Sequence, residues 1–88
     1  MKNIIIYTLN YCPYCKKAIE FFKGKNIPFE EIDVTYDEEK MSERIKNMFH
    51  IEKELTFPQI IIDKQNIGGY SDLIQLEEEG QLDKLLSI

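Results

Sequence analysis

Cys12 and Cys15 are the only cysteines in the chain, and just Pro13 and Tyr14 separate them. Two thiols at this spacing can exchange electrons with other sulfurs, contribute to a metal site, or form a structural disulfide. A structural zinc needs four ligands, and the only further soft ligand is His50, 35 residues beyond the second cysteine. A structural disulfide closing so short a loop removes little entropy from the unfolded chain. A redox pair is therefore the favoured interpretation, and a metal shared between two chains stays open.

The residues around the cysteines predict a strand followed by a helix. Ile4–Thr8 is β-branched and aromatic, which is typical of a buried strand. Pro13 suits the first helical position, because its missing N–H would have no partner there. Gly24 suits the end of the same helix. The apolar face of this helix consists of Cys15, Ala18, Ile19 and Phe22, at helical spacing.

This placement makes the two sulfurs unequal. Cys12 stands immediately before the helix, where unpaired backbone N–H groups and the helix dipole favour a thiolate over a thiol. Lys16 and Lys17 add positive charge in the first turns. Residues three apart on a helix are neighbours, close to the spacing that a disulfide requires. We therefore expect Cys12 to attack, and Cys15 to wait on the core side as the sulfur that resolves the product.

The rest of the chain predicts an α/β fold with the order β-α-β-α-β-β-α(-α). Residues 28–34 are expected to form a second strand, parallel to the first in a βαβ unit. Thr35 and Glu38 form a capping-box pattern at the start of a second helix. The inward stripe of that helix is predicted to be Met41, Ile45, Met48 and Phe49. The remaining elements expected are strands at 57–62 and 65–67, a helix from Asp72 capped by Ser71, and a short helix after Gly80.

Length and charge limit the possible classes of protein. The 88 residues predict a single domain, 1–88, with a modest core. The net charge of −5 disfavours nucleic-acid binding. Residues 1–36 carry five basic and four acidic side chains, against six and twelve in residues 37–88, which favours anionic partners near the cysteines. No apolar run approaches the ~20 residues of a membrane span or forms a signal peptide, so we expect a cytoplasmic location. We also expect a monomer.

Three segments together resemble the glutaredoxin family from one end of the chain to the other. Residues 12–15, CPYC, resemble the active site of the dithiol class of bacterial type. Residues 56–60, TFPQI, resemble its T-V-P-Q-I segment, whose proline is cis, and residues 68–72, GGYSD, resemble its G-G-x-[ST/D]-D segment. The resemblance implies a thioredoxin-like fold, with a four-stranded mixed sheet flanked by three to four helices. It also implies a glutathione-dependent thiol–disulfide oxidoreductase that needs no metal or bound cofactor.

The resemblance also implies a role for individual residues. Cys12 and Cys15 would be catalytic, and Pro13 and Lys16 would support them. The backbone of Phe57 would pair with an extended peptide, while the start of the last long helix would hold the γ-glutamyl end of glutathione. The residues implied to bind glutathione or substrate are Tyr14, Thr56, Phe57, Pro58, Gly69, Tyr70, Ser71 and Asp72.

One position departs from the family pattern. Relatives usually carry Lys or Arg three residues before the first cysteine, where this chain has Leu9. A cation that would meet the glycyl carboxylate of glutathione is thus missing, and Lys16, Arg44 and Lys46 are the candidates to replace it. The segment 48–55 is also a few residues longer than in the shortest relatives.

Several partners follow from the resemblance. Glutathione would be the co-substrate, and disulfide-containing or glutathionylated proteins would be the substrates. Tyr70 is similar to the tyrosine of bacterial glutaredoxins that serve ribonucleotide reductase, which suggests that enzyme as a partner. Two alternatives stay open: an electron carrier reduced by thioredoxin reductase, which the change at Leu9 allows, and a dimer holding an iron–sulfur cluster through Cys12 and glutathione. Pro13 disfavours the second alternative.

Overall fold

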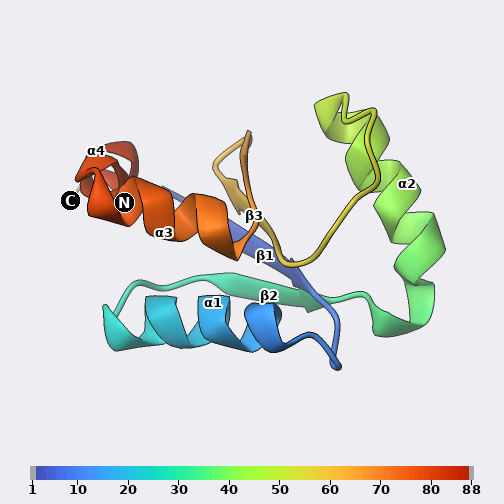
Figure 1. The fold of residues 1–88 in the computed structure, drawn as a ribbon, viewed down its shortest axis with the longest axis horizontal. Helices are drawn as coiled ribbons and strands as arrows, with labels where there is room; N and C mark the ends of the chain where they lie inside the picture. The colour runs from blue at the N-terminus through green and yellow to red at the C-terminus, as the bar shows by residue number, and fades with distance from the viewer. Residues whose placement is uncertain (1, 88) are drawn as a thin grey trace.

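The computed structural model describes residues 2–87, in which helices cover both faces of a four-stranded sheet (Figure 1). The order of elements is the predicted one. In sequence, they are β1 (Ile4–Thr8), α1 (Pro13–Gly24), β2 (Glu30–Asp33), the 3₁₀ turn η1 (Thr35–Asp37), α2 (Glu38–Phe49), β3 (Gln59–Ile62), β4 (Gln65–Gly68), α3 (Tyr70–Glu78) and α4 (Gln81–Leu86).

The sheet has the strand order β2-β1-β3-β4. β1 runs parallel to β2 and antiparallel to β3, and β4 returns antiparallel to β3, so the predicted βαβ unit and hairpin are confirmed. β2 and β3 begin two residues later than predicted. Pro28 opens the first predicted strand and Pro58 is the second residue of the other. A proline has no N–H to donate to a neighbouring strand, so each strand begins after it. Because β1 is an inner strand, the loop that follows it and carries the cysteines lies near the middle of one end of the sheet.

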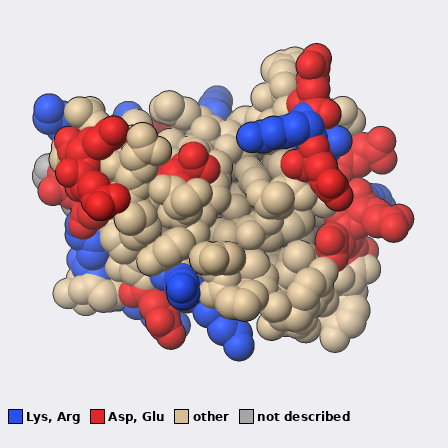
Figure 2. Space-filling model, viewed as in Figure 1, with Lys and Arg blue, Asp and Glu red and all other residues tan. Residues whose placement is uncertain are grey.

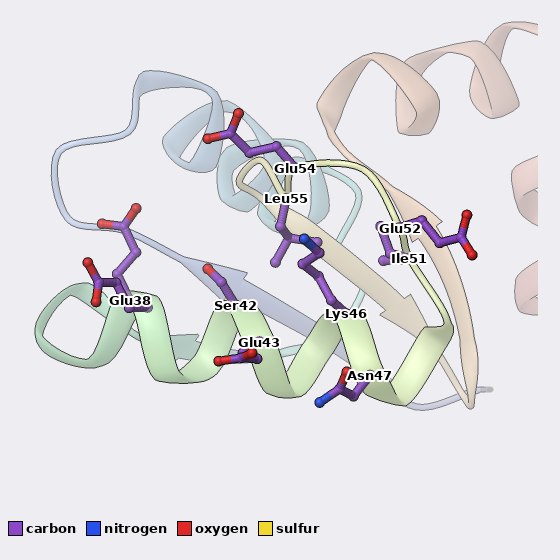
Figure 3. Close-up of a pocket in the computed structure, with 10 residues that line it drawn as sticks. Glu38, Ser42, Glu43, Lys46, Asn47, Ile51, Glu52, Glu54 and Leu55 are labelled. Atoms are coloured by element: carbon purple, nitrogen blue, oxygen red, sulfur yellow. The ribbon is translucent and has the colours of Figure 1, made fainter.

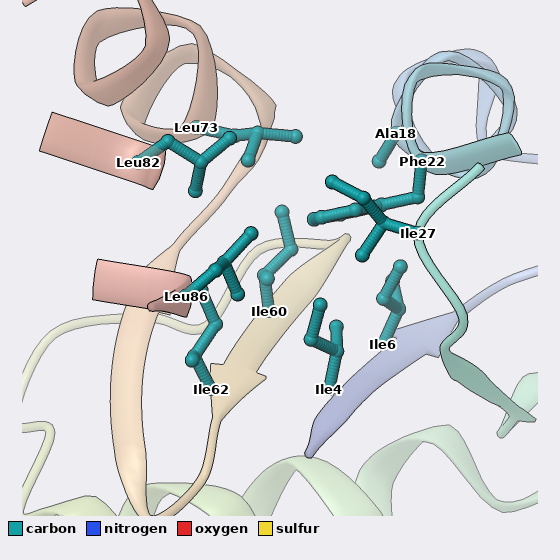
Figure 4. Close-up of a cluster of buried hydrophobic side chains, with 10 residues drawn as sticks. All are labelled: Ile4, Ile6, Ala18, Phe22, Ile27, Ile60, Ile62, Leu73, Leu82 and Leu86. Carbon is teal, nitrogen blue, oxygen red and sulfur yellow. The ribbon is translucent and has the colours of Figure 1, made fainter. Parts of the chain in front are cut away.

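Alternation along β1 divides the apolar side chains between two clusters. Ile4 and Ile6 lie on the face that α1, α3 and α4 cover, and Tyr7 and Leu9 lie on the face that α2 covers. Figure 4 shows that the strands and the helices both contribute side chains to the first cluster, with Phe22 directed from α1 toward the strands. Its buried members are Ile4, Ile6, Ala18, Phe22, Ile27, Ile60, Ile62, Leu73, Leu82 and Leu86.

The predicted capping box at the start of the second helix is wrong. α2 has Asp37 at its N-cap, without a hydrogen bond from that side chain, and a 3₁₀ turn precedes it. The Thr35 hydroxyl is engaged elsewhere: it donates to Asp33 and accepts the backbone N–H of Asn10 at 2.8 Å. The hydroxyl and the backbone N–H of Thr35, which both donate to Asp33, hold the pKa of the Asp33 carboxyl below its usual range. Thr35 therefore joins the cysteine loop to the end of β2.

The predicted inward stripe of α2 is correct at three positions and wrong at Met48. Ile45 is buried, and Met41 and Phe49 pack against the second cluster. Met48 is 53% exposed. Ile51 and Leu55, from the segment after α2, pack against the second cluster instead. The longer segment noted in the sequence therefore contributes to the core on the α2 side.

The charge is distributed as unevenly on the surface as along the sequence. Figure 2 shows acidic side chains gathered over α2 and at the α3–α4 end of this face, with lysines at the edge formed by α1. Within residues 2–87 no helix has the length and apolar character needed to span a bilayer.

Candidate active site

Cys12 occupies the N-cap of α1, as predicted, with Pro13 as the first helical residue. Its sulfur accepts a hydrogen bond from the backbone N–H of Cys15 at 3.2 Å. The Cys12 thiol also lies 3.4 Å from the carbonyl oxygen of Phe57, to which it donates. Both cysteines are free thiols. The backbone around Cys12 thus offers its sulfur one donor and one acceptor, which fixes its position at the helix start.

Cys15 is the less accessible of the two sulfurs. Its side chain faces the core, and the residue is 2% exposed, while Cys12 is partly exposed. Burial raises the pKa of the Cys15 thiol to about 12, with a further contribution from its hydrogen bond to Cys12 and opposition from the Leu9 backbone. Cys15 is therefore a neutral thiol at physiological pH, and the predicted division between an accessible and a reserve sulfur is present.

The segment before β3 places the backbone of Phe57 beside Cys12. The Phe57–Pro58 peptide bond is cis, as the family resemblance implied. The side chain of Gln59, 5% exposed, donates to the Thr56 carbonyl oxygen at 2.6 Å and accepts from Asn66 of β4 at 3.0 Å. This pair of hydrogen bonds ties the Thr56–Phe57 edge to the sheet.

The start of α3 differs from the prediction that Ser71 caps a helix from Asp72. Gly69 is the N-cap, Tyr70 is the first helical residue, and Ser71 lies exposed in the first turn. The Asp72 carboxylate accepts the Gly69 N–H at 2.9 Å, so it caps its own helix. Gly68 precedes this turn with φ +111°, a backbone conformation that favours glycine.

A groove of about 250 Å³ lies between the segment after α2, the end of β4 and the start of α3. Thr56, Gly69 and Asp72, which the sequence predicted as binding residues, all line it. Lys53 lines the same groove and was not among the predicted cations. The structure thus gathers the second and third motifs around one groove and adds a lysine to it.

Tyr14 and Tyr70 form an aromatic pair beside the cysteines. Their ring centroids lie 6.1 Å apart, and the Lys17 ammonium is 5.2 Å from the Tyr14 centroid and 6.0 Å from the Tyr70 centroid. Such contacts between a cation and a ring are favourable. The spacing of Tyr14 and Lys17, three residues apart on a helix, is the sequence feature that could have indicated the contact. Lys16 takes another direction and lines a cavity beside Cys15.

The loop before Cys12 is tied to the start of α2 by a contact that the sequence did not reveal. Tyr11 is 62% exposed, and its hydroxyl donates to the Glu38 carboxylate. This hydrogen bond raises the pKa of Tyr11. Leu9, at the position where the family resemblance led us to expect a cation, is buried in the cluster beneath α2.

A wider groove, of about 590 Å³, runs between α2 and the segment that follows it. Figure 3 shows the side chains that rise around it from both segments, including Lys46 and several acids. Of the lysines considered as replacements for the missing cation, Lys46 therefore lies in an acidic groove. Lys53 is the lysine that lies with Thr56 and Asp72.

A four-stranded mixed sheet with a Cys-x-x-Cys pair at the start of its first helix defines a thiol–disulfide oxidoreductase of thioredoxin-like fold. The glutaredoxin family model matches residues 4–67. The chain is 46% identical over 83 residues to glutaredoxin 1 of Rickettsia bellii, covering 94% of this chain and 85% of the relative. It is 41% identical over 86 residues to glutaredoxin 3 of Escherichia coli strain K12, covering 98% and 99%.

Solved structures agree with these sequence matches. The solution structure of glutaredoxin from Brucella melitensis has a TM-score of 0.79 at 38% identity, covering 98% of this chain and 89% of that one. The crystal structure of glutaredoxin 1 from Francisella tularensis has a TM-score of 0.76 at 32% identity, covering 90% and 95%. The chain belongs to the glutaredoxin family.

Proposed function

We propose that this protein uses glutathione to reduce protein disulfides and glutathione mixed disulfides. The observation that carries the proposal is the inequality of the two sulfurs: Cys12 is partly exposed at a helix start, and Cys15 is buried one turn later. The groove lined by Thr56, Gly69 and Asp72 supplies a place for glutathione. No bound cofactor or metal enters the proposed reaction.

In the first proposed route, the Cys12 thiolate attacks a glutathionylated substrate. A disulfide forms between Cys12 and the glutathione sulfur, and the substrate leaves as a thiolate. A second glutathione thiolate then attacks the glutathione sulfur of this mixed disulfide. Glutathione disulfide leaves, and the Cys12 thiolate is regenerated. Cys15 takes no part in this route.

In the second proposed route, Cys12 attacks a protein disulfide and Cys15 displaces the reduced substrate. This step forms the Cys12–Cys15 disulfide, which two glutathione molecules return to the dithiol. Glutaredoxins as a group have potentials of roughly −200 to −230 mV, near the cytosolic glutathione potential, so the reaction can run in either direction. The inward position of Cys15, with its N–H hydrogen-bonded to the Cys12 sulfur, supports the second step.

We assign a carboxylate of glutathione to Lys53. This lysine shares the groove with Thr56 and Asp72, and Leu9 offers no charge. Replacement of Lys53 by alanine should raise the KM for glutathione by about 10-fold or more, because a hydrogen bond to a charged group contributes roughly 1.5–3 kcal/mol. The kcat should change little, since Lys53 would contact the part of glutathione that does not react.

Lys46→Ala is the matched control for this prediction, because Lys46 lies in the acidic groove along α2. Steady-state kinetics at several glutathione concentrations separate the two constants. Equal KM values for the Lys53→Ala and Lys46→Ala variants would remove Lys53 from the binding site.

The proposal extends to the place of action and the partners. A cytoplasmic monomer that supplies electrons to disulfide-containing proteins, with ribonucleotide reductase among them, agrees with the family and with the tyrosine at position 70. The rival is a carrier reduced by thioredoxin reductase, which the buried Leu9 favours.

A glutathione-coupled assay on a glutathionylated peptide tests the proposed function. Turnover with NADPH, glutathione and glutathione reductase is compared with turnover with NADPH and thioredoxin reductase. We expect activity in the first system and little in the second. Activity in the thioredoxin reductase system alone would overturn glutathione dependence and establish the rival.

A further inference from the structure

A second cavity beside the cysteines has no part in the proposed binding of glutathione. It encloses about 350 Å³ between α1 and the edge strand β2, and Cys15 forms part of its wall. β1 and β2 are parallel with Ile6 opposite Glu31 and Thr8 opposite Asp33. Partners in such a register project to the same face of the sheet, so Thr8, Glu31 and Asp33 lie on the face that α1 covers.

Thr8 fixes the position of one carboxylate in this cavity. Its side chain is 2% exposed, and its hydroxyl donates to Oε2 of Glu31 at 2.8 Å. Asp33 also lines the cavity, but its Oδ1 accepts both the backbone N–H and the hydroxyl of Thr35. These two bonds lower the pKa of Asp33, which makes it the weaker proton acceptor. Glu31 is exposed to solvent, and the buried Thr8 holds its Oε2 on the face that α1 covers, so Oε1 can bind a water.

The second route requires Cys15 to lose its proton as it attacks. Cys15 is 2% exposed, and its pKa is raised to about 12, chiefly by burial. When Cys15 attacks, the Cys12 sulfur already belongs to a mixed disulfide and carries no charge. A base beside Cys15 would assist this loss, and the cavity that Cys15 lines without Cys12 contains Glu31.

We propose that Glu31, held by Thr8, accepts the proton of Cys15 through water in this cavity while Cys15 attacks the mixed disulfide at Cys12. The proposal rests on the second route of the proposed function. The bond between the Cys12 and Cys15 sulfurs forms, and the bond between Cys12 and the substrate sulfur breaks. The substrate sulfur leaves as a thiolate with the bonding electrons. The proton passes to the Glu31 carboxylate and from there to solvent.

The other charged groups around the cavity define its electrostatics and provide a control. Lys16, Lys23 and Glu20 line it from α1, and Asp33 lines it from β2. The two lysines offset the carboxylates, so the cavity can hold an anion without a large excess of negative charge. Glu20 has the same charge as Glu31 and lines the same cavity, but it belongs to α1 and not to the sheet. It therefore serves as the control residue.

The two-step reaction with dithionitrobenzoate isolates the step at Cys15 without glutathione. Cys12 first releases one thionitrobenzoate anion and retains the other, and Cys15 then releases the second, so absorbance rises in two phases. Glu31→Gln keeps an oxygen for the Thr8 hydroxyl but removes the proton acceptor. We expect it to slow the second phase by about 100-fold or more at pH 7, at the low end of general-base effects. The first phase is the internal reference.

The pH dependence separates loss of a base from loss of structure. The difference between Glu31→Gln and the wild type should shrink as the pH approaches 10, because hydroxide then removes the Cys15 proton. Thr8→Val, which removes the donor that positions the carboxylate, should slow the same phase, and Glu20→Gln should match the wild type.

A second phase in Glu31→Gln that is as fast as in the wild type, or faster, would overturn the proposal. The faster result would show that the Glu31 charge merely holds the proton on Cys15. A deficit that stays constant from pH 7 to pH 10 would also overturn it, because a misplaced sulfur would be slow at every pH. A missing first phase in the wild type would instead contradict the role of Cys12 in the proposed function.

Discussion

Replacement of Cys12 by serine should lower thiol–disulfide exchange by about three orders of magnitude or more, with every disulfide substrate. A serine hydroxyl remains protonated at neutral pH and is a poor nucleophile toward sulfur. Cys15 cannot take over, since it is 2% exposed and its pKa is raised to about 12. Initial rates with a glutathionylated peptide and with a protein disulfide measure the loss.

Cys15→Ser is the matched control, because it makes the same change one helical turn away. It should retain reduction of the glutathionylated peptide, which needs only Cys12, and lose most reduction of the protein disulfide. Circular dichroism should show that both variants keep the wild-type fold, and thermal unfolding should show that both remain folded at the assay temperature. Full activity of Cys12→Ser, or equal losses in both variants on the glutathionylated peptide, would contradict the assignment of Cys12 as the attacking sulfur.

Substitution of Gly68 by alanine should destabilise the protein by about 2–4 kcal/mol and weaken glutathione binding. A side chain at φ +111° is strained, which costs about 1–3 kcal/mol. The new Cβ would also collide with the Asp72 carboxylate, which accepts the Gly69 N–H at the start of α3. Loss of such a cap costs about 1 kcal/mol. Denaturant unfolding and the KM for glutathione report the two effects.

Gly24→Ala controls for the loss of backbone freedom alone. Gly24 is the last residue of α1 and has open space around its Cα, so alanine there should be neutral or stabilising by up to about 1 kcal/mol. If Gly68→Ala were as stable as Gly24→Ala, the contact between Gly68 and Asp72 would not determine the shape of the groove.

The parts of the fold that the sequence predicted correctly are specified by local patterns. The apolar run of β1 and the proline that opens α1 each determine their element without help from distant residues. The position of Cys12 at the N-cap follows from that proline. The unequal burial of the two cysteines follows from helical spacing, so the central part of the site could also be predicted.

The errors arise where more than one hydrogen-bond partner is available to a capping side chain or to a helix start. Thr35 matches a helix cap in sequence, but its hydroxyl bonds to Asp33 and accepts the N–H of Asn10, 25 residues earlier. Ser71 matches a cap as well, and Asp72 provides the cap by returning to Gly69. A propensity cannot rank such alternatives, because for Thr35 one partner comes from the tertiary fold and for α3 two capping residues lie in the same segment.

The residues that the sequence did not reveal are those placed by packing. Lys53 reaches the groove because the segment after α2 returns beside β4, and Glu31 meets Thr8 because of the register between β1 and β2. Neither residue forms a motif with its neighbours in the chain. The cis peptide bond before Pro58 was implied by the family resemblance, because the residues around a proline do not by themselves indicate a cis bond.

Competitive alkylation of the reduced native protein tests the inequality of the two sulfurs most directly. At pH 8 a thiol whose pKa is about 12 is ionised in about one molecule in ten thousand, and Cys15 is also buried. Iodoacetamide, with mass analysis of the cysteine-containing peptides, should therefore modify Cys12 at least about 100-fold faster than Cys15. In denaturant the two rates should become similar. Modification of both cysteines at similar rates in the native protein, or of Cys15 first, would contradict the account.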